Sequence, residues 1–211
     1  MLWIILGIIV SYFIGSTPTA YLAGKLLKGI DIRKHGSGNV GATNALRVLG
    51  KRAGIIVLLI DCLKGVIPVV FISDIILSKM PGFNPELVRI LFGVSSILGH
   101  NWTVFLNFKG GKGVATTFGV LIGLSFRIQG FALILGLVIL SWFVTFFISR
   151  IVSLASLVSA LIFPVLAIFL NHSRALLIFS LLTASFIIVR HKSNLKRLLQ
   201  GKEPRLSFKK K

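Results

Sequence analysis

The sequence consists of long apolar stretches separated by short segments rich in glycine, lysine and arginine. A membrane-spanning α-helix needs about 20 mainly apolar residues, and fewer where its ends are buried in protein. The expected spans are residues 2–24, 54–77, 87–106, 113–126, 129–148, 151–170 and 174–190. The fourth is short and directly follows GGKG, so a half-buried or re-entrant helix is an alternative there. The pattern predicts an all-α polytopic membrane helix bundle of about seven transmembrane helices, in a single integral membrane domain over residues 1–211.

The composition points to the bilayer as the solvent of this chain. Of the 211 residues, 55% are hydrophobic, which is too large a share for a soluble domain of this length. The single cysteine, Cys62, lies inside an apolar run. The sequence therefore has neither a disulfide framework nor a CxxC metal motif.

The charge is strongly basic, with 24 Lys and Arg against 5 Asp and Glu. Such an excess favours nucleic acid, anionic lipid headgroups or acidic substrates as partners. The cations lie between apolar spans rather than on one soluble module. We therefore expect membrane lipid and anionic small molecules as partners, and no nucleic acid.

The distribution of these cations predicts the orientation, because cytoplasmic loops carry an excess of Lys and Arg. With the N-terminus outside and the C-terminus cytoplasmic, the inner segments hold 18 of the 24 cations. These inner segments are residues 28–53, 107–113, 149–153 and 190–211, the last including a basic cytoplasmic tail over 198–211. Every glycine-rich or polar cluster then lies on the cytoplasmic face.

The first such cluster is HGSGNVGATNALRVLG, residues 35–50. Its glycines allow backbone conformations that other residues avoid, and they let N–H groups approach a ligand. Small polar side chains add donors, and Arg47 adds a planar cation suited to a phosphate. The candidate contacts are Ser37, Gly38, Asn39, Gly41, Thr43, Asn44 and Arg47. The alternative is a flexible cytoplasmic loop with ordinary helix-capping residues.

The second cluster is NFKGGKGVATTFG, residues 107–119, in which a glycine-rich loop leads into a helix at Val114. A helix N-terminus presents N–H groups and a positive dipole end to an anion. A nucleotide P-loop is excluded, because Gly113 follows Lys112 where Ser or Thr is needed, and a membrane helix precedes the loop instead of a strand. The candidate contacts are Lys109, Gly110, Gly111 and Lys112. Alternatively, the two lysines only anchor helix ends at the headgroups.

Two further clusters lie nearer the C-terminus. In SLAS, residues 153–156, Ser153 and Ser156 are candidate contacts, although small residues also pack membrane helices. In RHKSNLKRLLQGKEPR, residues 190–205, His191 and Asn194 share a face if the last helix continues one turn past the membrane. A basic tail attracted to anionic lipid accounts for part of this segment, above all for Lys209 to Lys211.

Asp61, Lys64 and His100 are ionisable residues within the apolar spans. Asp61 and Lys64 are three residues apart, and charges in hydrocarbon are normally paired and face the bundle interior. We interpret them as a structural ion pair. His100, after Gly99, is either a site residue or a hydrogen-bonded buried histidine, and we favour the structural role.

Some catalytic patterns are missing from the sequence. The few carboxylates include no pair placed to hold a divalent metal, and no metal or other cofactor is predicted. No histidine is followed by Asp five positions on, and no G-x-S-x-G elbow occurs. The chemistry must then rely on an activated substrate, which the protein orients and whose charge it neutralises.

The motifs resemble those of the bacterial acyl-phosphate-dependent glycerol-3-phosphate acyltransferases, a family of seven-span inner-membrane enzymes with the N-terminus outside. The resemblance rests on GS (15–16), GSGNVGATNALRVLG (36–50), DCLKG (61–65), GHNWTVFLNFKGGKGVAT (99–116), SLAS (153–156) and RHKSNLKRLLQGKE (190–203). One departure is Thr103, where family members usually carry proline in the GHxxPxF run.

The resemblance implies transfer of a fatty acyl group from acyl phosphate to the 1-hydroxyl of glycerol 3-phosphate, without acyl-CoA or acyl carrier protein as direct donor. It also implies an integral protein of the bacterial cytoplasmic (inner) membrane whose active site faces the cytoplasm. The phosphate of glycerol 3-phosphate is expected at Ser37, Arg47, Lys112, His191 and Asn194, with Ser153 or Ser156 contributing. The acyl-phosphate head is expected at backbone N–H groups around Gly38 to Gly41 and Gly110 to Gly111, near Asn39, Thr43, Asn44 and Lys109.

A small membrane transporter of an anionic metabolite is the alternative function. Several spans and the intramembrane pair Asp61 and Lys64 permit it. A transporter needs access from both sides, however, and the polar clusters gather on one face without an inverted repeat. The sequence therefore favours the enzyme.

Overall fold

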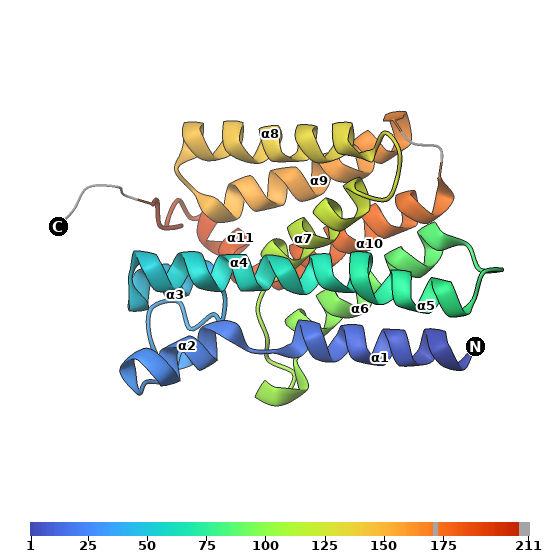
Figure 1. Ribbon diagram of the computed structural model, residues 1–211. Helices are drawn as coiled ribbons and strands as arrows, with labels where there is room; N and C mark the ends of the chain where they lie inside the picture. The colour runs from blue at the N-terminus through green and yellow to red at the C-terminus, as the bar shows by residue number, and fades with distance from the viewer. Residues whose placement is uncertain (171–172, 207–211) are drawn as a thin grey trace. The chain divides into compact units, whose positions relative to one another are not determined.

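The computed structural model describes residues 1–170 and 173–206, and these residues form helices and turns without a strand (Figure 1). They divide into two compact units, residues 1–128 and 129–211. The predicted all-α class is confirmed. Lys209 to Lys211, at the end of the predicted basic tail, lie outside the described residues.

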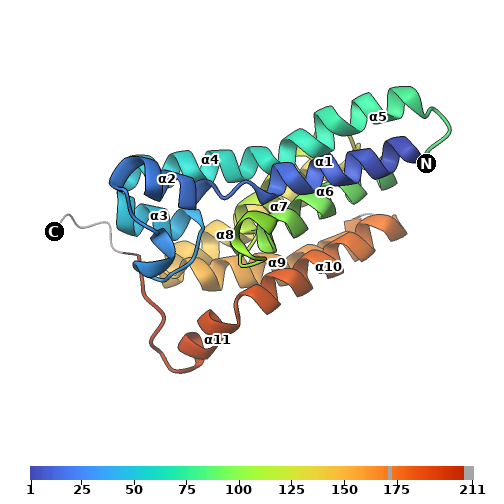
Figure 2. The same cartoon turned by 90° about the horizontal axis from the view of Figure 1, so that it is seen from below.

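The first unit contains ten helical elements, of which the longest run roughly side by side. Its N-terminus and the α5–α6 turn lie at one end, and α2 and α3 lie at the other (Figures 1 and 2). Its elements are α1 (Leu2–Ser16), α2 (Thr19–Lys28), η1 (Ile32–Lys34), α3 (Ala42–Leu49), α4 (Lys51–Ile67), η2 (Pro68–Ile72), α5 (Ser73–Lys79), α6 (Pro85–Asn101), η3 (Val104–Leu106) and α7 (Val114–Ser125).

The first expected span, residues 2–24, is broken at Thr17 and Pro18 into α1 and α2. Proline lacks an N–H group and its ring disrupts the preceding helical turn. The Thr17 carbonyl oxygen instead accepts a hydrogen bond from Lys64 Nζ at 2.6 Å. The break is therefore held in place by a buried cation on α4.

The second expected span is continuous but changes its winding at η2, a π-helical turn that begins at Pro68. The Val69 carbonyl oxygen in this turn accepts hydrogen bonds from Ser73 Oγ and, at 3.0 Å, from Arg89 Nη1. Arg89 also pairs with Asp74 at 2.7 Å. These side chains satisfy a carbonyl group within the irregular turn, and they join α5 to α6.

Glycines allow the helices of the first unit to approach closely. A Cβ atom on Gly119 of α7 would lie 1.8 Å from the Cys62 carbonyl oxygen of α4, and one on Gly65 would lie 2.2 Å from the Thr116 carbonyl oxygen. Between α1 and α6, Gly15 approaches the Ser96 carbonyl oxygen in the same way. Small residues at such contacts let membrane helices pack backbone against backbone.

The second unit contains α8 (Phe131–Ser149), α9 (Val152–Leu170), α10 (Arg174–Arg190) and α11 (Lys192–Leu199). Helix α9 packs against both α8 and α10. Phe163 of α9 contacts Phe131 and Phe179 edge to face, with ring centroids 6.3 and 5.8 Å apart. At His191 the chain bends by 65° into α11. The last apolar helix therefore does not continue straight past His191, which was the condition for His191 and Asn194 to share one helix face.

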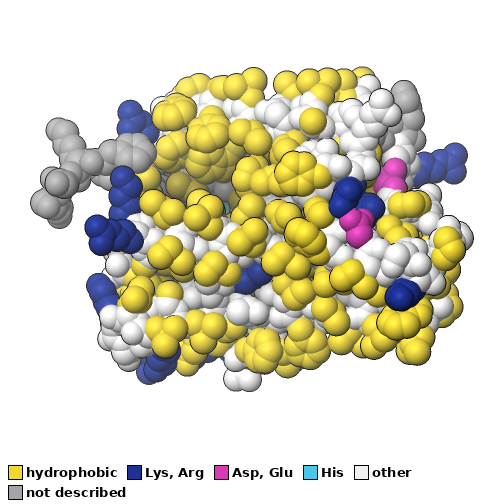
Figure 3. Space-filling model, viewed as in Figure 1, with side chains coloured by type: hydrophobic (Ala, Val, Ile, Leu, Met, Phe, Trp, Pro, Cys, Tyr) yellow, Lys and Arg dark blue, Asp and Glu magenta, His cyan; other side chains and the backbone are white. Residues whose placement is uncertain are grey.

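The lengths and compositions of the helices fit a membrane protein. Four described helical stretches can each cross a membrane, and the bent pair α10–α11 makes a fifth if it counts as one span. Helix α7 is a shorter apolar helix of 12 residues, which agrees with the short fourth segment expected from the sequence. Apolar side chains predominate on the face shown in Figure 3.

Candidate active site

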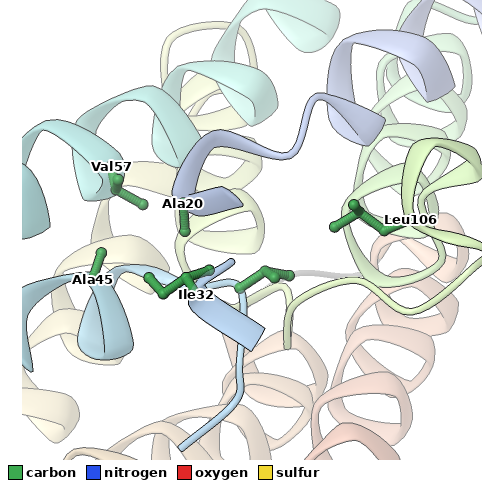
Figure 4. Packing of buried hydrophobic residues seen from close by; sticks show 6 residues of the cluster. Ala20, Ile32, Ala45, Val57 and Leu106 are labelled. Carbon is green, nitrogen blue, oxygen red and sulfur yellow. The ribbon is translucent and has the colours of Figure 1, made fainter. Parts of the chain in front are cut away.

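The two glycine-rich segments of the first unit, residues 35–50 and 107–113, rest on a common apolar cluster (Figure 4). Its buried members come from α2, η1, the loop before α3, α3 itself, α4 and η3. They are Ala20, Ile32, Val40, Ala45, Val57 and Leu106. Val40 and Ala45 of the first segment and Leu106, which precedes the second, are buried in this cluster. The two sequence motifs are thus connected to the same apolar cluster.

Asn44 organises the loop that carries Ser37. Its side chain is 2% exposed. Its Nδ2 donates to the Ile32 and His35 carbonyl oxygens at 3.3 and 3.1 Å, and its Oδ1 accepts from Ser37 N at 2.9 Å. The Asn44 side chain therefore holds the loop backbone, and its expected place near a substrate phosphate stays a prediction.

The other candidates of this segment lie at its surface. Ser37, Thr43 and Arg47 are exposed, while Asn39 and Gly41 are half-buried. Arg47 belongs to α3, whose buried side faces the apolar cluster through Ala45. The cation is therefore held on a short, packed helix and remains accessible.

The backbone N–H groups of the glycines have partners within the protein. Gly110 N donates to the Asn101 carbonyl oxygen at 3.2 Å, and Gly111 N donates to the His100 carbonyl oxygen at 3.0 Å. Gly38 N likewise donates to the His35 carbonyl oxygen at 3.0 Å. These three N–H groups shape the loops in this conformation, and a contact of the glycine-rich backbone with a phosphate stays a prediction.

The glycines of the second segment are required by close packing on the end of α6. A Cβ atom would lie 2.0 Å from the His100 carbonyl oxygen at Gly110, and 2.2 Å from His100 Nε2 at Gly111. Gly113 has a φ of +75°, which a residue with a side chain rarely adopts. This path places the half-buried Lys112 one residue before Gly113, the N-cap of α7, while Lys109 is exposed. The first turn of α7 offers N–H groups without acceptors inside the helix, and it is the positive end of the helix dipole.

In the second unit, Glu203 joins several candidates. Its Oε1 accepts hydrogen bonds from Ser153 Oγ at 2.7 Å and from Asn194 Nδ2 at 2.5 Å, and its Oε2 pairs with Arg197 Nε at 2.6 Å. Desolvation raises the pKa of this carboxyl, but the hydrogen bonds from Ser153, Asn194 and Arg197 outweigh it, so the pKa is lower than usual. Sequence reasoning missed this role, although Glu203 is one of only five acidic residues.

The segment after α11 returns to the turn between α8 and α9. Leu206 N donates to the Arg150 carbonyl oxygen at 2.8 Å, and Glu203 reaches Ser153 in the first turn of α9. This segment belongs to the predicted basic tail. Its described part, however, is attached to the helices through hydrogen bonds.

His191 lies at the bend between α10 and α11 and is buried. Its Nδ1 is 2.8 Å from the Ile187 carbonyl oxygen, so Nδ1 must carry the proton of a neutral ring. In this tautomer Nε2 carries the lone pair and is the nitrogen that can accept a proton. Ser156, by contrast, donates to the Val152 carbonyl oxygen and accepts from Trp142 Nε1, which joins α9 to α8.

The candidate residues suit an anion better than a cation. Lys109, Lys112 and Arg47 supply positive charge, and the hydroxyl and amide groups supply donors. Within residues 1–170 and 173–206, no three His, Cys, Asp or Glu side chains form a group that could hold a metal ion.

Apolar helices with polar, cationic loops at their ends define an integral membrane protein of the all-helical class. Lys112, which follows the closely packed Gly110 and Gly111, and the exposed Arg47 further indicate a membrane protein that binds anions. A family model described as glycerol-3-phosphate acyltransferase matches residues 5–201, and the chain belongs to this family. The family resemblance predicted from the motifs is confirmed, and membership favours an enzyme over the transporter alternative.

Curated relatives match over nearly their whole length. The glycerol-3-phosphate acyltransferase of Chlorobium phaeobacteroides (strain BS1) is 40% identical, covering 99% of this chain and 98% of that protein. The one from Chlorobaculum tepidum is 44% identical with the same coverage. That of Prochlorococcus marinus (strain NATL1A) is 46% identical over 92% of this chain and 94% of the relative.

Solved structures support the same assignment. The glycerol 3-phosphate form of PlsY (YgiH), an integral membrane glycerol 3-phosphate acyltransferase, has a TM-score of 0.81 and 34% identity, and covers 97% of this chain and 96% of its own. Its lysophosphatidic acid form also has a TM-score of 0.81, with 35% identity and coverage of 97% and 95%. The fold of this chain is therefore the fold of an acyltransferase that acts within a membrane.

Proposed function

We propose that this enzyme takes its fatty acyl group from acyl phosphate and transfers it to the 1-hydroxyl of glycerol 3-phosphate. The products are lysophosphatidic acid and inorganic phosphate. The observation that carries the proposal is the pair of cationic segments, with Arg47 and Lys112, that rest on one apolar cluster. Together they offer cations, hydroxyls and amides, but the sequence contains no His-x4-Asp base. Such a set of groups suits a donor that is already activated and negatively charged.

Acyl phosphate meets this requirement because it is a mixed anhydride with a good leaving group. The hydroxyl oxygen of glycerol 3-phosphate attacks the acyl carbonyl carbon and forms the new ester bond. The bond between that carbon and the bridging phosphate oxygen breaks, and the phosphate leaves with the electron pair. The hydroxyl proton passes to the departing phosphate or to His191 Nε2.

In the first unit, we propose that Ser37, Arg47 and Lys112 contact the phosphate of glycerol 3-phosphate. Their charges lower the repulsion between two anionic substrates and stabilise the charge that develops on the leaving phosphate. Asn39, Thr43 and Lys109 are proposed to contact the head of acyl phosphate. The N–H groups of the first turn of α7 are better candidates for such a contact than Gly110 and Gly111, whose N–H groups already bind α6.

In the second unit, we propose that His191 and Asn194 act on substrate and that Ser153 assists them. Glu203 holds the Asn194 amide through Nδ2 and thereby orients its oxygen. Nδ1 of His191 is bound to the Ile187 carbonyl oxygen, so we assign the acceptance of the hydroxyl proton to Nε2. A pH–rate profile that changes in His191→Ala supports this role, whereas an unchanged profile assigns the proton to the substrate phosphate.

The function also implies a location, which we propose is the bacterial cytoplasmic membrane with the cationic segments toward the cytoplasm. The bias of cations toward one set of loops supports this orientation. Glycerol 3-phosphate is polar and reaches the enzyme from water, whereas the acyl chains of donor and product reside in lipid. A reaction at the edge of the bilayer accommodates both.

The decisive experiment uses the purified full-length protein in lipid vesicles. Acyl phosphate and glycerol 3-phosphate are supplied together, and phosphate release and acyl transfer are followed in parallel. Acyl-CoA and acyl carrier protein carrying the same fatty acid serve as alternative donors. We expect rapid turnover with acyl phosphate alone. Equal or faster turnover with either thioester donor would overturn the donor assignment.

A further inference from the structure

His100 lies between a buried ion pair and the loop that carries Lys112. Its side chain is at the end of α6 and is 8% exposed. On one side, Nδ1 is 3.9 Å from Asp61 Oδ1, a distance that indicates an electrostatic contact rather than a hydrogen bond. On the other side, Nε2 occupies space 2.2 Å from the position of a Cβ atom on Gly111. The imidazole ring therefore fills the space between Asp61 of α4 and Gly111 of the loop.

The ion pair behind His100 is fixed on several sides. Asp61 and Lys64 are 1% and 4% exposed, and Lys64 Nζ lies 2.5 Å from Asp61 Oδ1. Lys64 Nζ also donates to the Thr17 carbonyl oxygen at 2.6 Å, which ties the pair to the break between α1 and α2. Ser96 Oγ of α6 donates to the Lys64 carbonyl oxygen at 2.6 Å. Buried charges of this kind are costly to separate, so Asp61 provides a rigid support for the ring.

The loop is held to the same residue by its backbone. The His100 carbonyl oxygen accepts the Gly111 N–H, and the neighbouring Asn101 carbonyl oxygen accepts the Gly110 N–H. Lys112 is the next residue in the chain. A change in the space that the His100 ring fills is therefore passed through one peptide unit to Lys112.

We infer that His100 is a positioning residue of the acyltransferase, which sets the place of Lys112 through Gly111 and is itself steadied by Asp61 and Lys64. The inference rests on the proposed role of Lys112. In this role His100 does not contact substrate, and its contribution consists of holding the Lys112 ammonium group where the substrate phosphate binds. A misplacement of about 1 Å at such a group lowers the rate by about 100-fold.

Two substitutions of His100 test whether acyl transfer depends on the space filled by Nε2, next to Gly111, or only on a polar group at the place of Nδ1. His100→Asn retains a polar group near the place of Nδ1 but leaves the space under Gly111 empty. His100→Gln has a longer side chain that reaches the place of Nε2. We expect kcat for acyl transfer to fall by about 10- to 100-fold in His100→Asn and by no more than about 3-fold in His100→Gln, with both proteins folded.

Ser95→Ala is the matched control on the same helix. Ser95 is buried and its Oγ donates to the Ile8 carbonyl oxygen of α1 at 2.7 Å, and no contact with the loop is involved in this bond. It should lower the melting temperature but leave kcat unchanged. A loss of kcat in His100→Asn that merely follows a loss of stability would also occur in Ser95→Ala, and that result would overturn the inference. Equal activities of His100→Asn and His100→Gln would do the same.

A double-mutant cycle with Lys112→Ala separates this inference from the proposed function. If His100 acts through Lys112, His100→Asn should change kcat by less than about 3-fold once Lys112 is absent. The same fold loss in both backgrounds would show that His100 acts elsewhere. Lys112→Arg replaces Lys112→Ala in the cycle if residual turnover is too low to measure. Each ratio of kcat values is measured with the acyl donor that the wild-type protein uses. An error in the proposed donor would therefore be seen in the wild-type assay and would not change these ratios.

Discussion

Single polar side chains determine the backbone path of the loops in this protein. Thr103 is an example, because its Oγ1 donates to the Ser16 carbonyl oxygen at 2.5 Å and accepts from Phe105 N at 3.2 Å. Its φ of −69° is the value that a proline ring imposes. Threonine thus has a φ that proline would also adopt, and it adds a hydrogen bond to the end of α1.

This bond predicts a measurable loss of stability in Thr103→Val, which keeps the shape of the side chain but lacks the hydroxyl. The Ser16 carbonyl group would lose a buried partner, and the free energy of unfolding should fall by about 1–2 kcal/mol. Thermal or denaturant unfolding in detergent measures the change. Thr17→Val is the matched control, because Thr17 is exposed and its hydroxyl contact is 3.5 Å long. Equal effects of the two substitutions would contradict the prediction.

The cations of the first unit predict a loss of activity without a loss of fold. Lys112→Ala removes the charge, and Arg47→Lys keeps a charge but loses the planar fork that binds two phosphate oxygens. Each should lower turnover by at least about 100-fold, with an unchanged melting temperature. Lys51→Ala, an exposed cation at the start of α4, should keep normal turnover. Near-normal activity of both test variants would refute the assignment.

The sequence could predict Ser37, Arg47 and Lys112 as candidates because charge and glycine content are local properties. It could not predict that the Asn44 side chain is used by the loop backbone, since that depends on the conformation of residues 32–37. The role of Glu203 was also hidden, because Ser153 lies 50 residues earlier in the chain. Hydrogen-bond partners that the fold brings together leave no periodic signal in the sequence.

At the scale of helices, glycine contacts decide how closely α4 and α7 pack. Gly119→Ala would place a Cβ atom 1.8 Å from the Cys62 carbonyl oxygen, so the helices must separate. We expect a loss of about 1–3 kcal/mol in the free energy of unfolding, as for other overpacked cores. Gly136→Ala in α8 is the control, because its Cβ would meet no atom of the described residues within 4 Å. That change should be neutral or stabilise by up to about 1 kcal/mol, and a Gly119→Ala protein of wild-type stability would contradict the close packing.

The hydrogen bonds of Glu203 predict a dependence of stability on pH. Its pKa in the folded protein is below the ordinary value, so the ionised form stabilises the fold. This contribution is complete above the ordinary Glu pKa of 4.5, and it is lost as the pH falls through the folded pKa. Glu203→Gln should melt at a lower temperature than wild type at neutral pH, and the difference should shrink in acid. The melting temperature of the control Glu86→Gln should fall in acid as that of the wild type does. A difference in melting temperature between wild type and Glu203→Gln that stays constant across pH would contradict the prediction.

Helices α8, α9 and α10 were predicted to within a few residues, because each is a long apolar run bounded by polar residues. The expected span 87–106 extends too far, since the apolar residues after Asn101 belong to a turn and to η3. The bend at His191 carries neither proline nor glycine, so nothing in the local sequence marks it. Hydropathy locates apolar segments but does not show where the backbone changes direction.

For the whole molecule, the uneven distribution of cations predicts the orientation in the membrane. In a Cys62→Ala background, Gly82→Cys in the α5–α6 turn should react with a membrane-impermeant maleimide on intact cells. Lys51→Cys, at the start of α4, should react only after the membrane is opened. An added Cβ at Gly82 meets no described atom within 4 Å, so this cysteine should be tolerated. The reverse labelling pattern would show that the proposed orientation is wrong.

The attachment of Glu203 to Ser153 and Asn194 has a consequence for biosynthesis. Residue 203 follows all four helices of the second unit in the chain, so it is the last of these partners to leave the ribosome. The helices can enter the membrane before that moment, but Asn194 cannot yet be held by its carboxylate. If transfer depends on an oriented Asn194, a newly made chain should reach full activity only after residue 203 has left the ribosome.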